Sequence, residues 1–462
     1  MPAYYHFKIC RTMTKFLPFL LLISLTIGCA GYKFQEVKTD LETGKPEDAY
    51  NYLKKNASKK PDIPHQFELG LTAHYANLFP ESSKAFEQAE MIAEDRFTKS
   101  VSKEALSLVT TDKLRPYAGT RYERLLSHYF HALNYIYLNK LDGALVECRR
   151  ATNLIQYFKG EEKEYNFFGT GFLAHFCGMV FEAAGEWNNA LISYRQAEEY
   201  YKNAAALTGV PVPNDVGHSL VRMARKLNFT DEFERYRNQY GEPSPRPENY
   251  GELILFFETG YVPRKREESL TFPILKTDKF GEDDDKDSIE FARTLRTREG
   301  LVVEEIKLEY LLHVAMPVIR SNRPHFAGIQ VSVGEDMAQG VLIEDVETMA
   351  IETLKAERTV ILIRTLARAL GKYLIFRKAK KENKVLGAVV NLAGVLTESA
   401  DTRSWQTLPN QIFLVRMPLP AGTHTLKLSF LNANERVSGS EPVPDVKISS
   451  NQITFLNYRT YK

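Results

Sequence analysis

Apolar positions between Gly171 and Tyr201 recur at helical spacing in two successive runs that meet at Gly185. Neighbouring apolar positions lie three or four residues apart, which is the pattern of an amphipathic helix with one buried face. Small residues stand where the two helices must touch: Gly178 lets the backbones approach, and Phe181 fills the gap between the helices. The second run continues the seam at Ala190, Tyr194 and Ala197. The stretch therefore predicts a helical hairpin.

The same arrangement of small and aromatic residues occurs earlier in the chain. A second hairpin has it at Ala132, Tyr135, Ala144, Cys148 and Ala151. A first, less regular hairpin has it at Leu69, Gly70, Phe86 and Ala89. The pattern resembles the tetratricopeptide repeat, which implies a stack of hairpins with a concave binding surface and no chemistry of its own. The alternative interpretation is a set of ordinary core helices.

We expect this tetratricopeptide-like repeat domain to cover residues 41–241 as a degenerate array. A last helical pair is predicted at 216–227 and 230–240, with Asn214 or Asp215 as its N-cap. Residues 242–250 then form a proline-rich linker, because three prolines between Glu242 and Glu248 prevent the helix from continuing.

The chain changes character after the linker, where apolar and polar residues begin to alternate as they do in strands. Strands are predicted at 253–257, 310–318, 328–333, 412–417, 425–430 and 453–458. The turn Pro420-Ala421-Gly422 predicts that the fourth and fifth of these form a β-hairpin. We expect residues 251–462 to form a β-rich C-terminal domain with a helical insertion at about 346–399. The predicted fold class is thus α+β and multidomain.

The N-terminus predicts a cell compartment. Residues 1–28 carry basic residues, no acidic residue, and the apolar run Phe16–Ile27, which has the length of a secretory signal rather than of a membrane span. The segment Thr26-Ile27-Gly28-Cys29 resembles a bacterial lipoprotein signal, although Thr26 stands where the family usually has leucine. The resemblance implies acylation of Cys29 and a tether over residues 29–40. Ala30 after the cysteine implies export to the outer membrane.

Two alternatives stay open at this end of the chain. Cys29 could follow an ordinary cleaved signal by chance, and the chain could start at Met13 rather than Met1, because Met13 already begins a complete signal. No later segment is expected to span a bilayer, since Arg364, Arg368 and Lys372 interrupt the best candidate.

Charge and cysteine content exclude several classes of function. The 462 residues include 60 Lys plus Arg and 58 Asp plus Glu, so no excess charge directs the chain to nucleic acid. The four cysteines form no C-x-x-C pattern. Cys148 and Cys177 fall at seam positions of neighbouring hairpins and are expected to be buried thiols, with a disulfide as the alternative. His128 and His131 share a helix face, but no third ligand accompanies them at useful spacing, so neither a metal nor a cofactor is predicted.

Arg364, Arg368 and Lys372 repeat every four residues beside an apolar helix face. As a basic ridge, they are candidate contacts for a partner or an anion, such as a lipid headgroup or a peptidoglycan carboxylate. The interpretation we favour is a solvated face with some residues paired internally.

The most distinctive cluster of the C-terminal half comprises Asp401, Arg403 and Trp405, whose alternate spacing places them on one side of an extended segment. We interpret it as a structural cluster, an ion pair and a buried indole that lock the helix to the sheet. A catalytic role for Asp401 is the alternative, but no nucleophile, metal ligands or phosphate loop accompany it. The acidic run 282–287 lacks the glycine and distal glutamate of a calcium loop, so a linker is expected there.

Taken together, these features resemble a family of uncharacterised Gram-negative outer-membrane lipoproteins with tetratricopeptide-like repeats. The resemblance rests on the lipoprotein signal, the repeat half, and the segments Gly251–Glu258, Arg364–Tyr373 and Ala400–Pro409. That family has no established activity. Its genes often lie near those of activators of penicillin-binding proteins, which implies a role in the cell envelope by association.

The leading hypothesis is a lipid-anchored periplasmic scaffold, not an enzyme, that binds a protein partner through its helical repeats. Its partners are then the membrane, through acyl chains, and envelope proteins that could include the cell-wall synthesis machinery. A second hypothesis is a peptidoglycan- or glycan-binding lipoprotein, based on Trp405 and the basic ridge. A third is a hydrolase that uses Asp401 with His424 or His313.

Overall fold

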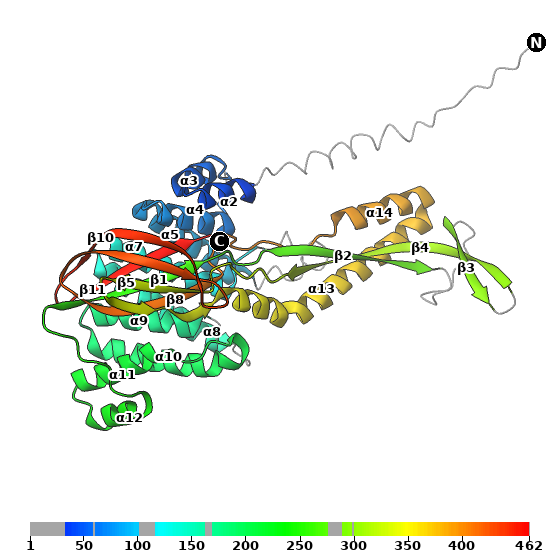
Figure 1. Cartoon of the computed structure of the whole chain (residues 1–462). Coiled ribbons are helices and arrows are strands. Elements are labelled where there is room, and N and C mark those ends of the chain that lie inside the picture. Colours follow the sequence, from blue (N-terminus) through cyan, green and yellow to red (C-terminus); the bar gives the residue numbers. More distant parts are fainter. Residues whose placement is uncertain are drawn as a thin grey trace, which may run out of the picture.

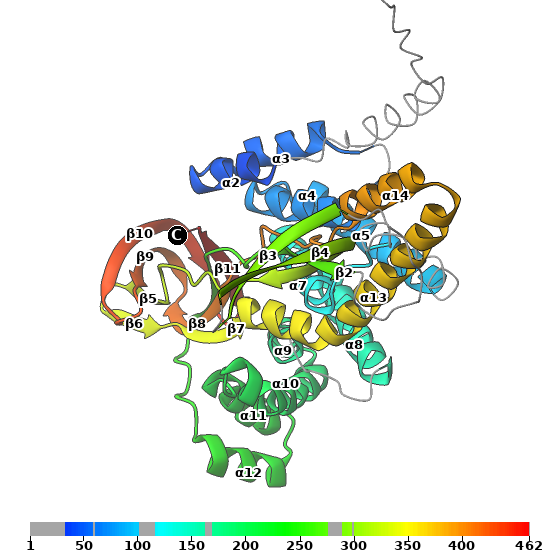
Figure 2. The same ribbon diagram turned by 90° about the vertical axis from the view of Figure 1, so that its right-hand side faces the viewer.

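The computed structural model describes residues 33–58, 61–100, 116–161, 169–275, 289–297 and 300–461. The expected signal at 1–28, Cys29 and the acidic run at 282–287 lie outside the described residues. The described chain forms a body of helices and two sheets, from which a long arm projects (Figure 1). A view turned by 90° shows the helices ranged along one side of the sheets (Figure 2).

The described residues of the N-terminal half form five helical hairpins. Their helices are α2 (Phe34–Glu42), α3 (Pro46–Lys55), α4 (Ile63–Tyr75), α5 (Phe79–Ser100), α7 (Arg121–Tyr137), α8 (Leu141–Glu161), α9 (Thr170–Ala183), α10 (Trp187–Thr208), α11 (Asn214–Lys226) and α12 (Thr230–Tyr240). Each of these helices packs against the next one along the chain. The structure therefore contains the succession of helical hairpins that the repeat pattern predicts.

The hairpins are closed by aromatic rings that lie on glycines. A Cβ atom added to Gly178 would lie 2.7 Å from the ring of Tyr194, and the same holds at 2.6 Å for Gly70 and Phe86. At Gly178 the missing side chain thus leaves room for the Tyr194 ring of the second helix, whereas a close approach of the two backbones was expected. Because the ring occupies the space of a missing side chain, the interhelical seam is closely packed.

Two local predictions for this half were wrong. The segment 29–40 is not a tether throughout, since α2 begins at Phe34 and buries Val37 and Leu41, which lie on one helical face. Asn214 is the first residue of α11, and no side chain caps that helix. The Asp215 carboxylate instead accepts a hydrogen bond from His175 Nε2 at 2.8 Å.

The C-terminal half begins with two four-stranded sheets. We call the sheet β11-β1-β8-β7 the inner sheet and the sheet β10-β9-β5-β6 the outer sheet. The strands are β1 (Tyr250–Thr259), β5 (Gly328–Val333), β6 (Asp336–Gln339), β7 (Val341–Asp345), β8 (Gln411–Pro420), β9 (Gly422–Leu431), β10 (Val437–Ile448) and β11 (Ile453–Thr460). β11 runs parallel to β1, and the other pairs are antiparallel.

The predicted hairpin of 412–417 with 425–430 was wrong. Both segments are strands, β8 and β9, but β8 pairs with β1 and β7 in the inner sheet while β9 pairs with β5 and β10 in the outer sheet. The chain changes sheets at Ala421, whose N–H donates to the carbonyl of Asn249 at 2.9 Å. Leu426 and Leu428 of β9 therefore face β8 across a sandwich core instead of pairing with it.

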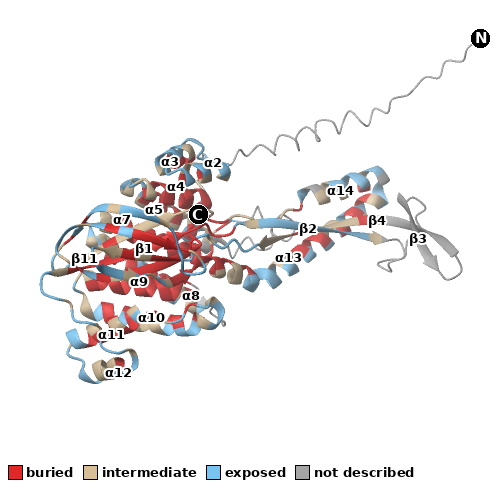
Figure 3. Ribbon diagram, in the orientation of Figure 1, coloured by how far each residue is buried: buried red, intermediate tan, exposed pale blue. Residues whose placement is uncertain are grey.

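The helical array and the sheets share one apolar core. Alternate residues of β1, such as Leu255 and Phe257, pack toward the outer sheet, whereas Ile254 and Phe256 pack toward the helices. The ring of Phe256 contacts Tyr129 of α7 at a centroid distance of 5.5 Å. Figure 3 shows the buried residues gathered where helices and inner sheet meet. The proline-rich segment thus joins two halves that pack into one body.

The arm consists of the sheet β2-β4-β3 and a helical hairpin. Its elements are β2 (Lys265–Leu275), β3 (Ile289–Thr297), β4 (Gly300–Ile319), α13 (Val346–Glu382) and α14 (Lys384–Thr397). Both helices contact β4, and Tyr310 of that strand packs against Tyr373 and Phe376 of α13. The two helices fall in the segment where a helical insertion was expected. Across the parts of the chain described above, none of the helices combines the length and the apolar character needed to cross a bilayer.

Candidate functional site

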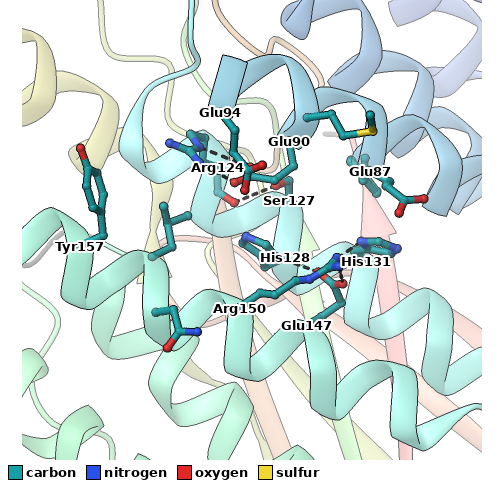
Figure 4. A pocket seen from close by; sticks show the side chains of 14 residues that line it. Glu87, Glu90, Glu94, Arg124, Ser127, His128, His131, Glu147, Arg150 and Tyr157 are labelled. Atoms are coloured by element: carbon teal, nitrogen blue, oxygen red, sulfur yellow. Dashed lines mark hydrogen bonds and ion pairs between the residues drawn. The ribbon is translucent and has the colours of Figure 1, made fainter. Parts of the chain in front are cut away.

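A cleft of ≈ 620 Å³ lies in the helical array between α5, α7 and α8. Figure 4 shows its lining, which is mostly charged and polar. The labelled residues are Glu87, Glu90, Glu94, Arg124, Ser127, His128, His131, Glu147, Arg150 and Tyr157. A charged cleft inside a repeat array is the best-formed candidate binding site in the described part of the chain.

Two histidines and a carboxylate form the base of this cleft. The Nδ1 atoms of His128 and His131 lie 2.8 and 3.3 Å from one carboxylate oxygen of Glu147, and Arg150 donates to the other oxygen at 2.9 Å. Burial opposes ionisation of Glu147, but the hydrogen bonds and charges of the two histidines outweigh it and lower the pKa of this carboxyl. Glu147 therefore sits as an anion at the base.

Glu147 was not predicted from the sequence to be a neighbour of the histidines. His128 and His131 are on α7, whereas Glu147 is on α8, and only the hairpin brings them together. Its position directly before the seam residue Cys148 was the available signal. Even with Glu147, no group of three or more His, Cys, Asp or Glu side chains among the described residues is arranged to hold a metal ion.

The wall opposite the base comes from α5. Glu87, Glu90 and Glu94 lie three or four residues apart and so share one helical face. Glu90 pairs with Arg124 of α7, while Glu87 and Glu94 are exposed at the rim together with Met91, which is 65% exposed. The rim thus combines carboxylates with an apolar side chain, a combination suited to a segment that carries a cation and an apolar residue.

The predicted cluster at 401–405 lies against the helices. Asp401 pairs with Arg403 at 2.7 Å, and the Trp405 indole is fully buried and stacked on Phe67 of α4 at a centroid distance of 4.6 Å. The cluster therefore joins its segment to the helical array, not the insertion to a sheet as we interpreted it. Trp405 is part of the core and presents no surface on which a sugar could stack.

Buried carboxylates of the array hold the same segment by its backbone. Glu123 of α7 accepts the N–H of Trp405 at 2.6 Å, and Glu68 of α4 accepts that of Gln406 at 2.6 Å. Glu123 also accepts the N–H of Thr120 at 2.8 Å as half of a capping box. The carboxylate of Glu123 thus caps the N-terminus of α7, which lines the cleft, and also holds the backbone of the segment around Trp405.

The cations at 364, 368 and 372 form no basic ridge, and two of them are paired internally, as the favoured interpretation predicted. Arg368 is 1% exposed and donates to Glu398 at 2.8 Å, and Lys372 donates to the other oxygen of the same carboxylate at 2.7 Å. Arg364 is half-buried and also has a partner. The turn between α13 and α14 brings Glu398 back against these cations, so Arg368 and Lys372 are committed to an internal ion pair.

The residues invoked for a hydrolase are not brought together. Asp401 accepts hydrogen bonds from Arg403, while His424 Nε2 lies 2.8 Å from the carbonyl of Pro420. His313 is on the arm, where its Nδ1 lies 2.9 Å from the Thr271 hydroxyl. Cys148 and Cys177 are both buried and free.

The inner face of the array, formed by α4, α7, α9 and α11, is covered by the inner sheet. Tyr75 and Tyr129 donate to Glu258 of β1 at 2.6 and 2.9 Å. Arg416 of β8 donates to Glu182 of α9 at 2.9 Å and lies 3.5 Å from Asp215 of α11. Burial raises the pKa of Glu258, although hydrogen bonds from the two phenols oppose this. The surface that a repeat array commonly offers to a partner is therefore filled by this chain's own strands.

Comparisons with known proteins add little. No family model and no curated protein matches the chain. Among solved structures, MamA 41-end from Desulfovibrio magneticus RS-1 is 12% identical, with 45% of this chain and 89% of that chain covered and a TM-score of 0.28. A kinesin light chain from Podosopora anserina with nearly identical TPR-like repeats is 16% identical, with 45% and 90% covered and a TM-score of 0.30. Aspartyl phosphate phosphatase F from Bacillus subtilis is 15% identical, with 44% and 47% covered and a TM-score of 0.30. Likenesses at this level say nothing about function.

Proposed function

We propose that this chain is a lipid-anchored periplasmic scaffold that binds a protein partner through its helical array, in the service of cell-envelope biogenesis. The observation that carries the binding role is the charged cleft between α5, α7 and α8. It is a hollow in a stack of helical hairpins, and it remains accessible although the inner sheet covers the other side of the array. The lipid anchor and the envelope role rest on the resemblances of the sequence alone.

The lining of the cleft defines the chemistry of the partner segment. The exposed carboxylate of Glu87 attracts a lysine or arginine side chain, and Met91, one helical turn further along α5, offers an adaptable apolar contact. The base is already neutralised internally, because Glu147 is paired with Arg150 and two histidines. The partner is therefore a short protein segment that presents a cationic and an apolar side chain to the rim.

Site-specific photo-crosslinking in living cells tests this function. A benzophenone amino acid replaces Met91 at the rim, and in a matched control it replaces Leu207, an exposed apolar residue of α10 that is 49% exposed. We expect a light-dependent adduct with a defined envelope protein from position 91 and none from position 207. Glu87→Lys reduces the adduct, whereas Glu199→Lys on α10 does not. Absence of an adduct at 91, or equal adducts at both positions, contradicts the proposal.

The anchor requires a separate experiment. Labelled palmitate is expected to enter the chain, globomycin to block its maturation, and Cys29→Ser to abolish both effects. A chain that takes up no label and stays in the cell interior contradicts the anchor and the compartment but leaves the cleft untouched. The glycan-binding and hydrolase hypotheses find no support, because Trp405, Arg368 and Lys372 are used inside the fold and the Asp401 carboxylate is paired with Arg403.

A further inference from the structure

The middle part of helix α13 exposes apolar residues and pairs charged residues inside the arm. Between Val360 and Ile375, every residue in the exposed class is apolar. Ile363, Leu366, Leu370 and Leu374, spaced three or four apart, are 62, 41, 53 and 64% exposed. On the opposite side of the helix, Arg368 and Lys372 pair with Glu398. This is the reverse of the pattern of a helix that faces water.

Helix α14 continues the same surface. From Val385 to Thr397 it contains no charged residue, and Val385, Val389 and Leu392 are 73, 48 and 62% exposed. The two helices pack side by side on β4, with α14 so close to α13 that a Cβ on Gly387 would lie 2.9 Å from Lys380. We call the outer face of the hairpin the surface formed by Ile363, Leu366, Leu370, Leu374, Val385, Val389 and Leu392.

Cations flank this outer face. The end of α13 carries Arg377, Lys378, Lys380 and Lys381. In the whole stretch 359–397 the only acidic residue is Glu382. The hairpin is therefore strongly cationic as well as apolar, while its outer face itself is free of charge.

We propose that the outer face of the hairpin lies in the interfacial layer of an anionic phospholipid surface, with the cations at the end of α13 among the headgroups. An apolar helix face beside a cluster of lysines and arginines is what such an interface binds. The hairpin lies on the membrane and does not cross it, because the described helices include none suited to spanning. A second copy of the chain is a poorer occupant, since the cations beside its own outer face would meet those of the first copy. The proposal does not depend on acylation of Cys29.

A fluorescent environment probe on single cysteines tests this contact. The full chain carries the probe through Leu374→Cys, or through Met337→Cys on β6 as a control of equal exposure, 64% in each case. The chain without either substitution gives the background from native thiols. With phosphatidylglycerol vesicles that contain a spin-labelled lipid, we expect quenching and a blue shift at position 374 and neither at 337. Vesicles of phosphatidylcholine are expected to give a weaker effect, as is high salt. A probe at 374 that is as little quenched as one at 337 overturns the proposal.

One doubly substituted variant separates lipid binding from other contacts, with the probe placed through Val389→Cys. Leu370→Gln with Leu374→Gln removes apolar contact without adding charge. We expect this variant to need about tenfold more lipid for half-maximal quenching. The circular dichroism of this variant must match that of the parent chain. Unchanged quenching overturns the proposal. The proposal is also overturned if the chain sediments as a dimer, and the double substitution dissociates this dimer while quenching persists. In that case the outer face binds a second copy of the chain.

Discussion

Trp405→Ala tests whether the helical array and the inner sheet fold as one unit. The indole is completely buried and is stacked on Phe67 of α4, and it also contacts Phe86 of α5 and Phe130 of α7 at centroid distances of 5.6 and 6.0 Å. Its N–H donates to the hydroxyl of Thr407 at 3.0 Å. The side chain thus lies between three helices although it comes from the C-terminal half.

The expected loss of stability is large. Removing a buried tryptophan costs about 3–5 kcal/mol in the free energy of unfolding. Each aromatic pair adds about 0.5–1.5 kcal/mol beyond buried area, so the value belongs near the upper end, about 5 kcal/mol. The matched control is Trp187→Ala at the α9–α10 turn. That ring is only partly buried and has Lys226 5.0 Å from its centroid, so we expect a loss of about 1 kcal/mol.

Guanidinium unfolding measures both losses. Far-ultraviolet circular dichroism follows all helices, while in the Trp405→Ala chain the remaining Trp187 reports by fluorescence on a hairpin remote from position 405. Because the two halves share a core, both signals are expected to move to lower denaturant together. A loss below about 1 kcal/mol, or a Trp187 signal that keeps its midpoint, refutes the shared core.

Three further predictions concern other parts of the fold. Glu398→Gln leaves the buried Arg368 charge uncompensated and is expected to cost about 3–5 kcal/mol, measured by unfolding and by faster hydrogen exchange in the arm. Gly178→Ala places a Cβ against the ring of Tyr194 and is expected to lower the free energy of unfolding by about 1–3 kcal/mol. Gly371→Ala meets no atom within 4 Å and is expected to raise it by up to about 1 kcal/mol. Equal effects in denaturant unfolding contradict the packing at Gly178. Burial lowers the pKa of His74 from 6.5 to about 4, so between these pH values the unfolded chain binds a proton that the folded chain does not bind. The free energy of unfolding is therefore expected to decrease by up to about 3 kcal/mol as the pH is lowered from 6.5 to 4. His74→Gln is expected to reduce this pH dependence.

The parts of the fold that local patterns control could be predicted from the sequence. Helical periodicity and the glycine at the turn were enough for the hairpin that meets at Gly185, because each helix buries a stripe against its immediate neighbour. The strand at 328–333 was found with its exact bounds for the same reason, since alternation with period two is a local property.

Pairing between distant segments could not be predicted in this way. β8 and β9 are adjacent in sequence and joined by a turn, yet they do not pair with each other: β8 pairs with the distant strands β1 and β7, and β9 pairs with the distant strand β5 as well as with its neighbour β10. The decision depends on which apolar faces meet in the sandwich, and alternation alone does not contain that information. For the same reason, the carboxylate of Glu147 beside His128 and His131 became visible only when α8 was placed against α7.

The error on α13 has a different origin, and it changes where binding is sought. A helical pattern identifies one apolar and one charged face but does not show which of them faces water. The charged face was expected to be exposed because this is the usual arrangement in globular proteins. Here Glu398, thirty residues beyond Arg368, neutralises the charged face inside the arm, so the apolar face is the exposed one. The inner sheet likewise covers the inner face of the helical array, which the repeat pattern would assign to a partner. With both expected surfaces occupied by the chain itself, we place the proposed contacts with other molecules on two surfaces that the described part of the fold leaves open, the cleft on the helical array and the outer face of the hairpin.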